Sequence, residues 1–209
     1  MTMERSREVP YGLGNNSIVN REAISSPLSA ETQKIVEHMQ NDGYAVYETI
    51  GRTPASLRSD GMRYWYLNKR LADVTTPPAL LAFKKYTFEF FLAGSQNIAH
   101  REQVKLLPEE QRKVDEKYPG AGLVVREGKL PEWTEIALKH LKETGVRILG
   151  RDYGYRLTWT DTYENEEPGA LRAQFGNWTG AGGADVDLWG PDGVFLVLGL
   201  ASLVEIPRK

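Results

Sequence analysis

The 209-residue chain contains no cysteine. This absence excludes disulfide bonds, thiolate metal ligands and a cysteine nucleophile, and it is typical of proteins in a reducing compartment. No apolar run is long enough to cross a bilayer as a helix, because the longest, residues 194–204, contains Gly199 and Ser202. Residues 1–20 lack the continuous apolar segment of a secretory signal. We therefore expect a soluble protein with no membrane contact, located in the cytoplasm or within a virion.

The chain also lacks a strong charge of either sign. It has 26 basic and 28 acidic residues, and its formal net charge is −2. The basic residues do not form the stripe that would neutralise phosphates, so nucleic acid is not an expected partner. Hydrophobic residues make up 41% of the chain, which is ordinary for a globular protein that buries a core.

Specific catalytic and cofactor motifs are missing. The glycines of residues 176–193 are not followed by the lysine and hydroxyl residue of a phosphate-binding loop, and no Gly-x-Ser-x-Gly motif occurs. The three histidines, His38, His100 and His140, lie too far apart in the sequence to form a local metal motif. We therefore predict no cofactor and no metal, and the missing motifs favour a non-enzymatic protein over an enzyme.

The residues present predict an extended arm followed by one domain. Residues 1–27 are polar, contain proline and glycine, and follow neither helical nor strand periodicity. Residues 28–209 are expected to form a single α+β domain, with helices after Ser29, around Pro108 and after Pro131.

Strand patterns separate the helices and then replace them. Residues 44–50, 62–67 and 122–128 read as strands, and Tyr86 to Leu92 show the clearest alternation of apolar and polar residues. After Gly145 the segments 147–152, 155–163, 170–178, 184–189 and 194–207 are all strand-like. The fold class expected is α+β, with a helix and strand N-terminal part followed by a largely antiparallel C-terminal sheet.

The candidate binding residues lie in the aromatic, glycine-rich C-terminal region. Strand geometry puts Asp185, Asp187 and Trp189 on one face of a strand, while residues 176–183 read as a flexible connection. The aspartates do not follow the helix-loop-helix calcium pattern, because Trp189 stands where a third oxygen donor belongs. In the connection we expect Trp178 to be solvent-accessible, with Asn177 beside it as a further binding residue.

Three functions follow from these observations. The leading hypothesis is a non-enzymatic interaction or structural protein, for example a component of a viral or phage assembly. It would bind a protein partner or further copies of itself through its arm and C-terminal loops. The first alternative is a small carboxylate-dependent hydrolase with His140 and Asp161 as its acid/base pair. The second is a carbohydrate-binding module that holds a glycan on Trp178 and Trp189.

Overall fold

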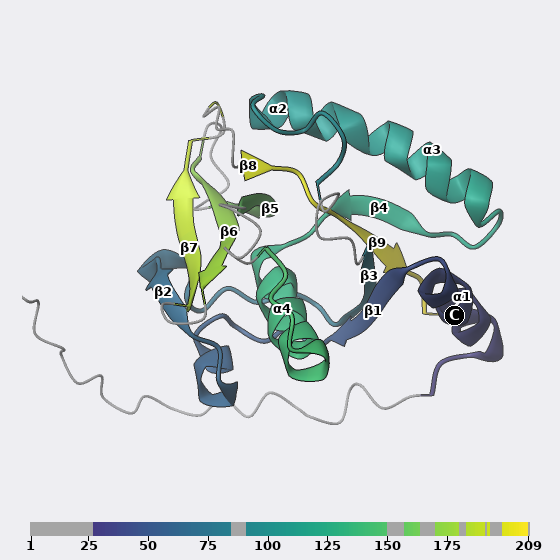
Figure 1. Ribbon diagram of the computed structural model, residues 1–209, viewed down its shortest axis with the longest axis horizontal. Helices are drawn as coiled ribbons and strands as arrows, with labels where there is room; N and C mark the ends of the chain where they lie inside the picture. The colour runs from purple at the N-terminus through teal and green to yellow at the C-terminus, as the bar shows by residue number, and fades with distance from the viewer. Residues whose placement is uncertain are drawn as a thin grey trace, which may run out of the picture.

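A computed structural model of the protein describes residues 27–84, 91–149, 157–163, 170–179, 183–190, 192 and 198–208. These residues form a single α+β domain with two sheets (Figure 1). The helices are α1 (Ala30–Asn41), α2 (His100–Gln103), α3 (Leu107–Lys117) and α4 (Leu130–Thr144), with 3₁₀ turns η2 (Ser56–Asp60), η3 (Lys69–Leu71) and η4 (Val104–Leu106).

The first sheet is antiparallel throughout, and the second is antiparallel at its centre. The first has the order β1 (Tyr44–Thr49), β3 (Ala79–Lys84), β9 (Ser202–Ile206), β4 (Val124–Glu127). The second has the order β2 (Tyr64–Leu67), β7 (Gly183–Trp189), β6 (Arg172–Thr179), β5 (Leu157–Tyr163), β8 (Leu198–Gly199). Only the pairs β2–β7 and β5–β8 are parallel in it. The predicted fold class is therefore confirmed.

Helices α1 and α4 begin and end at residues that the sequence marks. The Ser29 side chain accepts a hydrogen bond from the Thr32 amide at 3.1 Å and caps α1. In α4 the Glu132 carboxylate accepts a hydrogen bond from the Lys129 amide at 2.7 Å, which fixes the first turn. Gly145, with φ of 74°, then ends the helix in the left-handed conformation that glycine adopts without strain.

Helix α4 packs against both sheets and holds the main core. Its residues from Leu130 to Leu138 are all buried. Trp133 and Ile136 belong to one cluster with Phe83 of β3 and Phe175 of β6. Figure 1 shows α4 beside both sheets, between β6 and β1. The helix therefore joins the two sheets through a shared apolar core.

The opposite face of the first sheet is covered by α1 and α3. Met39 of α1 and Val114 of α3 pack there against Leu80, Ala82 and other sheet residues. Pro108 falls in the first turn of α3, where its missing N–H costs no hydrogen bond, so it starts this helix instead of interrupting a longer one.

Several predicted strands differ from those observed. Residues 79–84, for which the sequence analysis predicted neither helix nor strand, form β3. Alternate side chains of β3 enter the cores on opposite faces of the first sheet. Residues 85–90 of the predicted alternating strand lie outside the described part, and Phe91 and Leu92 are not in a strand. Residues 147–149, predicted as strand, are irregular and form a turn.

The C-terminal region also differs from the prediction. Strand β6 continues to Thr179, so residues 176–179 belong to a strand and not to a flexible connection. The single strand predicted over residues 194–207 is divided, since β8 belongs to the second sheet and β9 to the first. Backbone donors at the crossing are satisfied by side chains: Leu200 N binds Ser95 Oγ at 3.1 Å, and Ala201 N binds Thr158 Oγ1 at 3.0 Å.

The predicted N-terminal arm falls almost wholly on residues 1–26, which lie outside the described residues. The described helices include none with the length and apolar character that a bilayer crossing requires.

Candidate functional site

Strand β2 exposes two neighbouring aromatic side chains. The side chain of Trp65 is 71% exposed and that of Tyr66 is 45% exposed, and within the described part no other large hydrophobic side chain is as exposed as Trp65. Tryptophan is on average highly buried, so an indole this exposed on a strand indicates an interaction surface.

A β-bulge explains why Trp65 projects from the sheet. The register between β2 and β7 passes from Tyr64↔Ala184 directly to Tyr66↔Asp185, which makes Trp65 the extra residue. A bulge leaves its extra residue unpaired and redirects its side chain. Tyr64 is anchored on the core side, where its hydroxyl donates to Pro54 O at 2.9 Å.

The outer edge of β2 is open and lies among basic residues. β2 is the end strand of the second sheet, and in the described residues its only strand partner is β7. Arg63 precedes the strand, Lys69 and Arg70 follow it, and all three are exposed. We call Arg63, Trp65, Tyr66, Lys69 and Arg70 the β2 surface. An open strand edge presents unpaired N–H and C=O groups to which another chain can bind.

The predicted alternation of β7 is confirmed beside this surface. Val186 is buried in the main core, while Asp185 and Asp187 are half-buried on the opposite face, which also carries Tyr66. Asp187 Oδ1 accepts hydrogen bonds from Asn68 Nδ2 at 3.3 Å and from the Leu188 amide at 2.7 Å. Burial and the neighbouring Asp187 carboxylate raise the pKa of Asp185.

The other predicted binding residues do not all join this surface. Trp189 is half-buried and packs on a separate apolar cluster with Leu157 and Trp159. Asn177 and Trp178 belong to β6 by their backbone, but their side chains lie outside the described part. Their role in binding stays a prediction.

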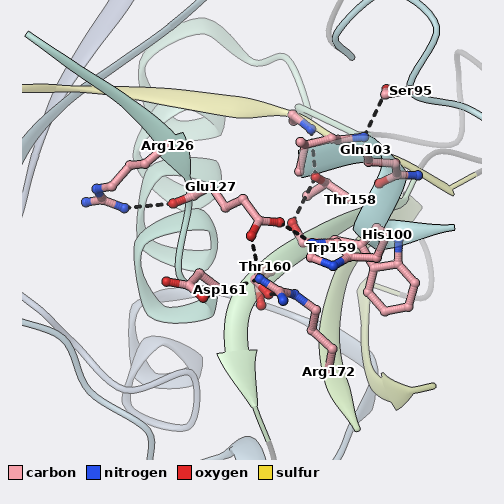
Figure 2. A network of polar contacts seen from close by, with 12 residues as sticks. Ser95, His100, Gln103, Arg126, Glu127, Thr158, Trp159, Thr160, Asp161 and Arg172 are labelled. Atoms are coloured by element: carbon pink, nitrogen blue, oxygen red, sulfur yellow. Dashed lines mark hydrogen bonds and ion pairs between the residues drawn. The ribbon is translucent and has the colours of Figure 1, made fainter. Parts of the chain in front are cut away.

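A second cluster of polar side chains is buried where the two sheets meet (Figure 2). It links His100 at the start of α2, Glu127 at the end of β4 and Arg172 at the start of β6, all of them buried. His100 Nε2 donates to Glu127 Oε1 at 2.6 Å, and Arg172 Nη2 donates to Glu127 Oε2. Arg172 Nε donates to Thr160 O at 2.7 Å.

This cluster reaches the surface through Arg172. Its guanidinium group binds Asp161 Oδ1 at 3.3 Å and the hydroxyl of Tyr163, and both of these side chains are about half exposed. The Glu127 carboxylate oxygens are both occupied by His100 and Arg172. With its charges paired internally in this way, the cluster ties the two sheets together.

The histidine of the hydrolase hypothesis lies elsewhere. His140 is buried near the end of α4, and its Nδ1 shares a hydrogen bond of 2.8 Å with the Tyr47 hydroxyl, whose pKa burial raises. Its ring contacts that of Phe83 edge to face, with centroids 5.5 Å apart.

Asp161 is placed near the opposite end of α4. The hydroxyl of its neighbour, Thr162, accepts a hydrogen bond of 2.9 Å from the amide of Leu130, the first residue of the helix. Ten residues of α-helix separate Leu130 from His140, which is about 15 Å. The structure therefore does not bring His140 and Asp161 together. Asp161 is instead connected to His100, because Arg172 contacts both Asp161 and Glu127, and Glu127 binds His100.

Sequence reasoning assigned Tyr64–Leu67 to a strand but did not predict the exposure of Trp65 and Tyr66. A signal was present, because three consecutive aromatic residues in one strand cannot all point to its buried face. At least one of them must then face solvent or the opposite side of the sheet.

The described residues contain no group of three histidine or carboxylate side chains that could hold a metal ion. In comparisons with known proteins, no family model matches the chain, and no curated protein or solved structure matches it either.

Proposed function

We propose that the protein is a non-enzymatic binding protein whose β2 surface receives an extended, acidic segment of a protein partner. The observation that carries this proposal is the 71% exposure of Trp65 on an open sheet edge. Tryptophan, tyrosine and arginine are the residue types that contribute most to protein–protein binding energy. All three types occur together on this surface.

The charges of the β2 surface support an acidic partner. Arg63 precedes the strand that carries the two aromatic side chains, Lys69 and Arg70 follow it, and all three are exposed. The neighbouring Asp60 already has a partner, since it forms an ion pair with Arg52. A second copy of the chain would bring the same basic residues close to one another, which disfavours self-association through this edge.

The mode of binding that fits an open edge is strand addition. In that mode the main chain of the partner pairs with the edge strand, and alternate side chains contact the surface on either side. The N-terminal arm and the aromatic C-terminal loops remain predicted as further sites of contact with the partner.

The proposal can be tested with short labelled peptides. One peptide alternates valine with glutamate, and the other has lysine in place of each glutamate. Fluorescence anisotropy should detect binding of the glutamate peptide only. Trp65→Ala should weaken that binding about thirtyfold, as expected for a hot-spot residue worth ~2 kcal/mol.

Val124→Ala is the matched control, because Val124 is 50% exposed on an edge strand of the other sheet. This variant should bind the glutamate peptide with unchanged affinity. Failure of the glutamate peptide to bind, equal binding of both peptides, or equal effects of the two substitutions would each contradict the proposal.

A glycan is the second candidate ligand, and one observation favours it. Tyr66 lies directly opposite Asp185, and Asn68 is hydrogen-bonded to Asp187, so an aromatic ring and several hydrogen-bonding groups are close together. Titration with a panel of oligosaccharides separates the two candidates. Glycan affinity should fall in Asp185→Asn and persist in Arg63→Gln, whereas peptide affinity should show the opposite pattern.

A further inference from the structure

A separate cavity lies against the first sheet, beside α3. It has a volume of about 350 Å³ and is bounded by α3, the ends of β1, β3 and β9, and the loop of residues 91–96. Binding cavities for small ligands start at about 300 Å³, so this one suits a compact molecule and not a long lipid chain. None of the residues that line it belongs to the β2 surface.

One wall of the cavity is charged. Lys84 of β3 and Lys113 of α3 both donate to the Glu110 carboxylate, each at 3.3 Å. Charge-assisted hydrogen bonds of this kind are normally 2.7–2.9 Å long, so both contacts are loose. Among the described residues that line the cavity, two ammonium groups share one carboxylate, which leaves one net positive charge and further ammonium N–H donors.

The remaining walls are mostly apolar. Phe91, Leu92 and Val204 supply a ring and aliphatic groups. Tyr44 also lines the cavity, and burial together with the nearby Glu110 raises the pKa of its phenol to about 12. The phenol therefore stays protonated at neutral pH and can donate a hydrogen bond.

We propose that this cavity binds a small organic anion with an apolar, preferably aromatic, body. The anionic group, a carboxylate, sulfonate or phosphate monoester, lies between Lys84 and Lys113. The body packs against Phe91, Leu92 and Val204. A cationic ligand does not fit this arrangement, because the carboxylate that would hold it is already neutralised by two lysines.

Two fluorescent probes with similar rings test the charge requirement. The anionic probe is 8-anilinonaphthalene-1-sulfonate, and the neutral probe is N-phenyl-1-naphthylamine, which lacks the sulfonate. The folded protein should bind the anionic probe saturably at one site, and the neutral probe more weakly. No saturable binding of the anionic probe, or equal affinity for both probes, would overturn the proposal.

Substitutions of the lysines and of the glutamate in the charged wall should change the affinity for the anionic probe in opposite directions. Lys84→Gln combined with Lys113→Gln should weaken binding of the anionic probe about tenfold, because two partly exposed ion pairs are lost. Glu110→Gln should tighten it, because the competing carboxylate is removed. Binding of the neutral probe should change little in either variant.

Lys105→Gln combined with Lys117→Gln is the matched control. Both lysines are exposed, take part in ion pairs and do not line the cavity. Equal effects of the two double variants, or weaker binding in Glu110→Gln, would show that the probe binds elsewhere. Trp65→Ala should leave probe binding unchanged, so this proposal and the proposed function can fail independently.

Discussion

Arg172 uses almost every donor of its guanidinium group. It contacts a buried carboxylate, a backbone carbonyl, a half-exposed carboxylate and a phenol, on Glu127, Thr160, Asp161 and Tyr163 respectively. The group also lies 4.4 Å from the centre of the Tyr163 ring. Among the described residues, the Glu127 carboxylate has His100 as its only other side-chain hydrogen-bond partner. The charge on Glu127 is therefore tolerated inside the protein largely because of Arg172.

Replacing this side chain should be costly. Arg172→Gln leaves the buried Glu127 carboxylate without its cation, and breaking a buried pair in this way costs about 3–5 kcal/mol. The free energy of unfolding, measured with urea, should fall by that amount. Arg112→Gln is the control, because the ion pairs that Arg112 forms with Glu109 and Glu116 are exposed, and such surface pairs contribute little to stability. Similar losses in the two variants would contradict this account of Arg172.

At the scale of elements, the passage from β8 to β9 depends on close packing around Gly199. A Cβ atom at this position would lie 2.6 Å from the Phe91 ring. The ring thus occupies the space that any other residue would need, and it does so where the chain crosses from the second sheet to the first.

Gly199→Ala should therefore destabilise the protein by about 1–3 kcal/mol through overpacking. Gly190→Ala provides the comparison, because a Cβ atom at Gly190 would meet no atom within 4 Å. Thermal unfolding followed by circular dichroism should show a lower midpoint for the first variant and an unchanged midpoint for the second. An unchanged midpoint in Gly199→Ala would mean that Phe91 can move aside without cost.

The elements differ in how far the sequence could predict them. Helices α1 and α4 were predictable because Ser29, Pro131 and Gly145 act on the backbone close to them in the sequence. Strand β3 was not, because it is buried on both faces and shows no alternation of polar and apolar residues. The division between β8 and β9 depends on contacts with Ser95 and Thr158, which are remote in the sequence.

The candidate site shows the same limit. The common face of Asp185 and Asp187 follows from strand periodicity alone, and sequence analysis predicted it correctly. The exposure of Trp65 depends on a bulge against β7, a strand more than one hundred residues away in the sequence. No local pattern specifies that pairing.

For the whole molecule, the central feature is that both sheets share one core. Trp133 of α4 packs in a cluster that includes Tyr47 of the first sheet and Phe175 of the second. The charged cluster around Glu127 and Arg172 also crosses from one sheet to the other. If either sheet unfolds, the face of the other sheet that packs in this shared core becomes exposed.

We therefore expect the described domain to unfold in a single cooperative step. Far-UV circular dichroism reports on all helices and strands, and tryptophan fluorescence reports on the buried Trp133 and Trp159. The two signals should give coincident transitions in urea, as in two-state unfolding. Two separated transitions would show that the sheets are independently stable.

The position of β9 in the first sheet affects how the protein folds as it is synthesised. β3 and β4 each pair with β9, which lies between them, although β3 ends at Lys84, β4 ends at Glu127 and β9 begins only at Ser202. Until β9 has left the ribosome, β3 and β4 of the nascent chain lack the strand that pairs with both of them. Such non-local pairing forms slowly, and the unpaired strand edges are exposed to aggregation in the meantime. Production of this protein in cells should accordingly depend on chaperones that bind unfinished chains.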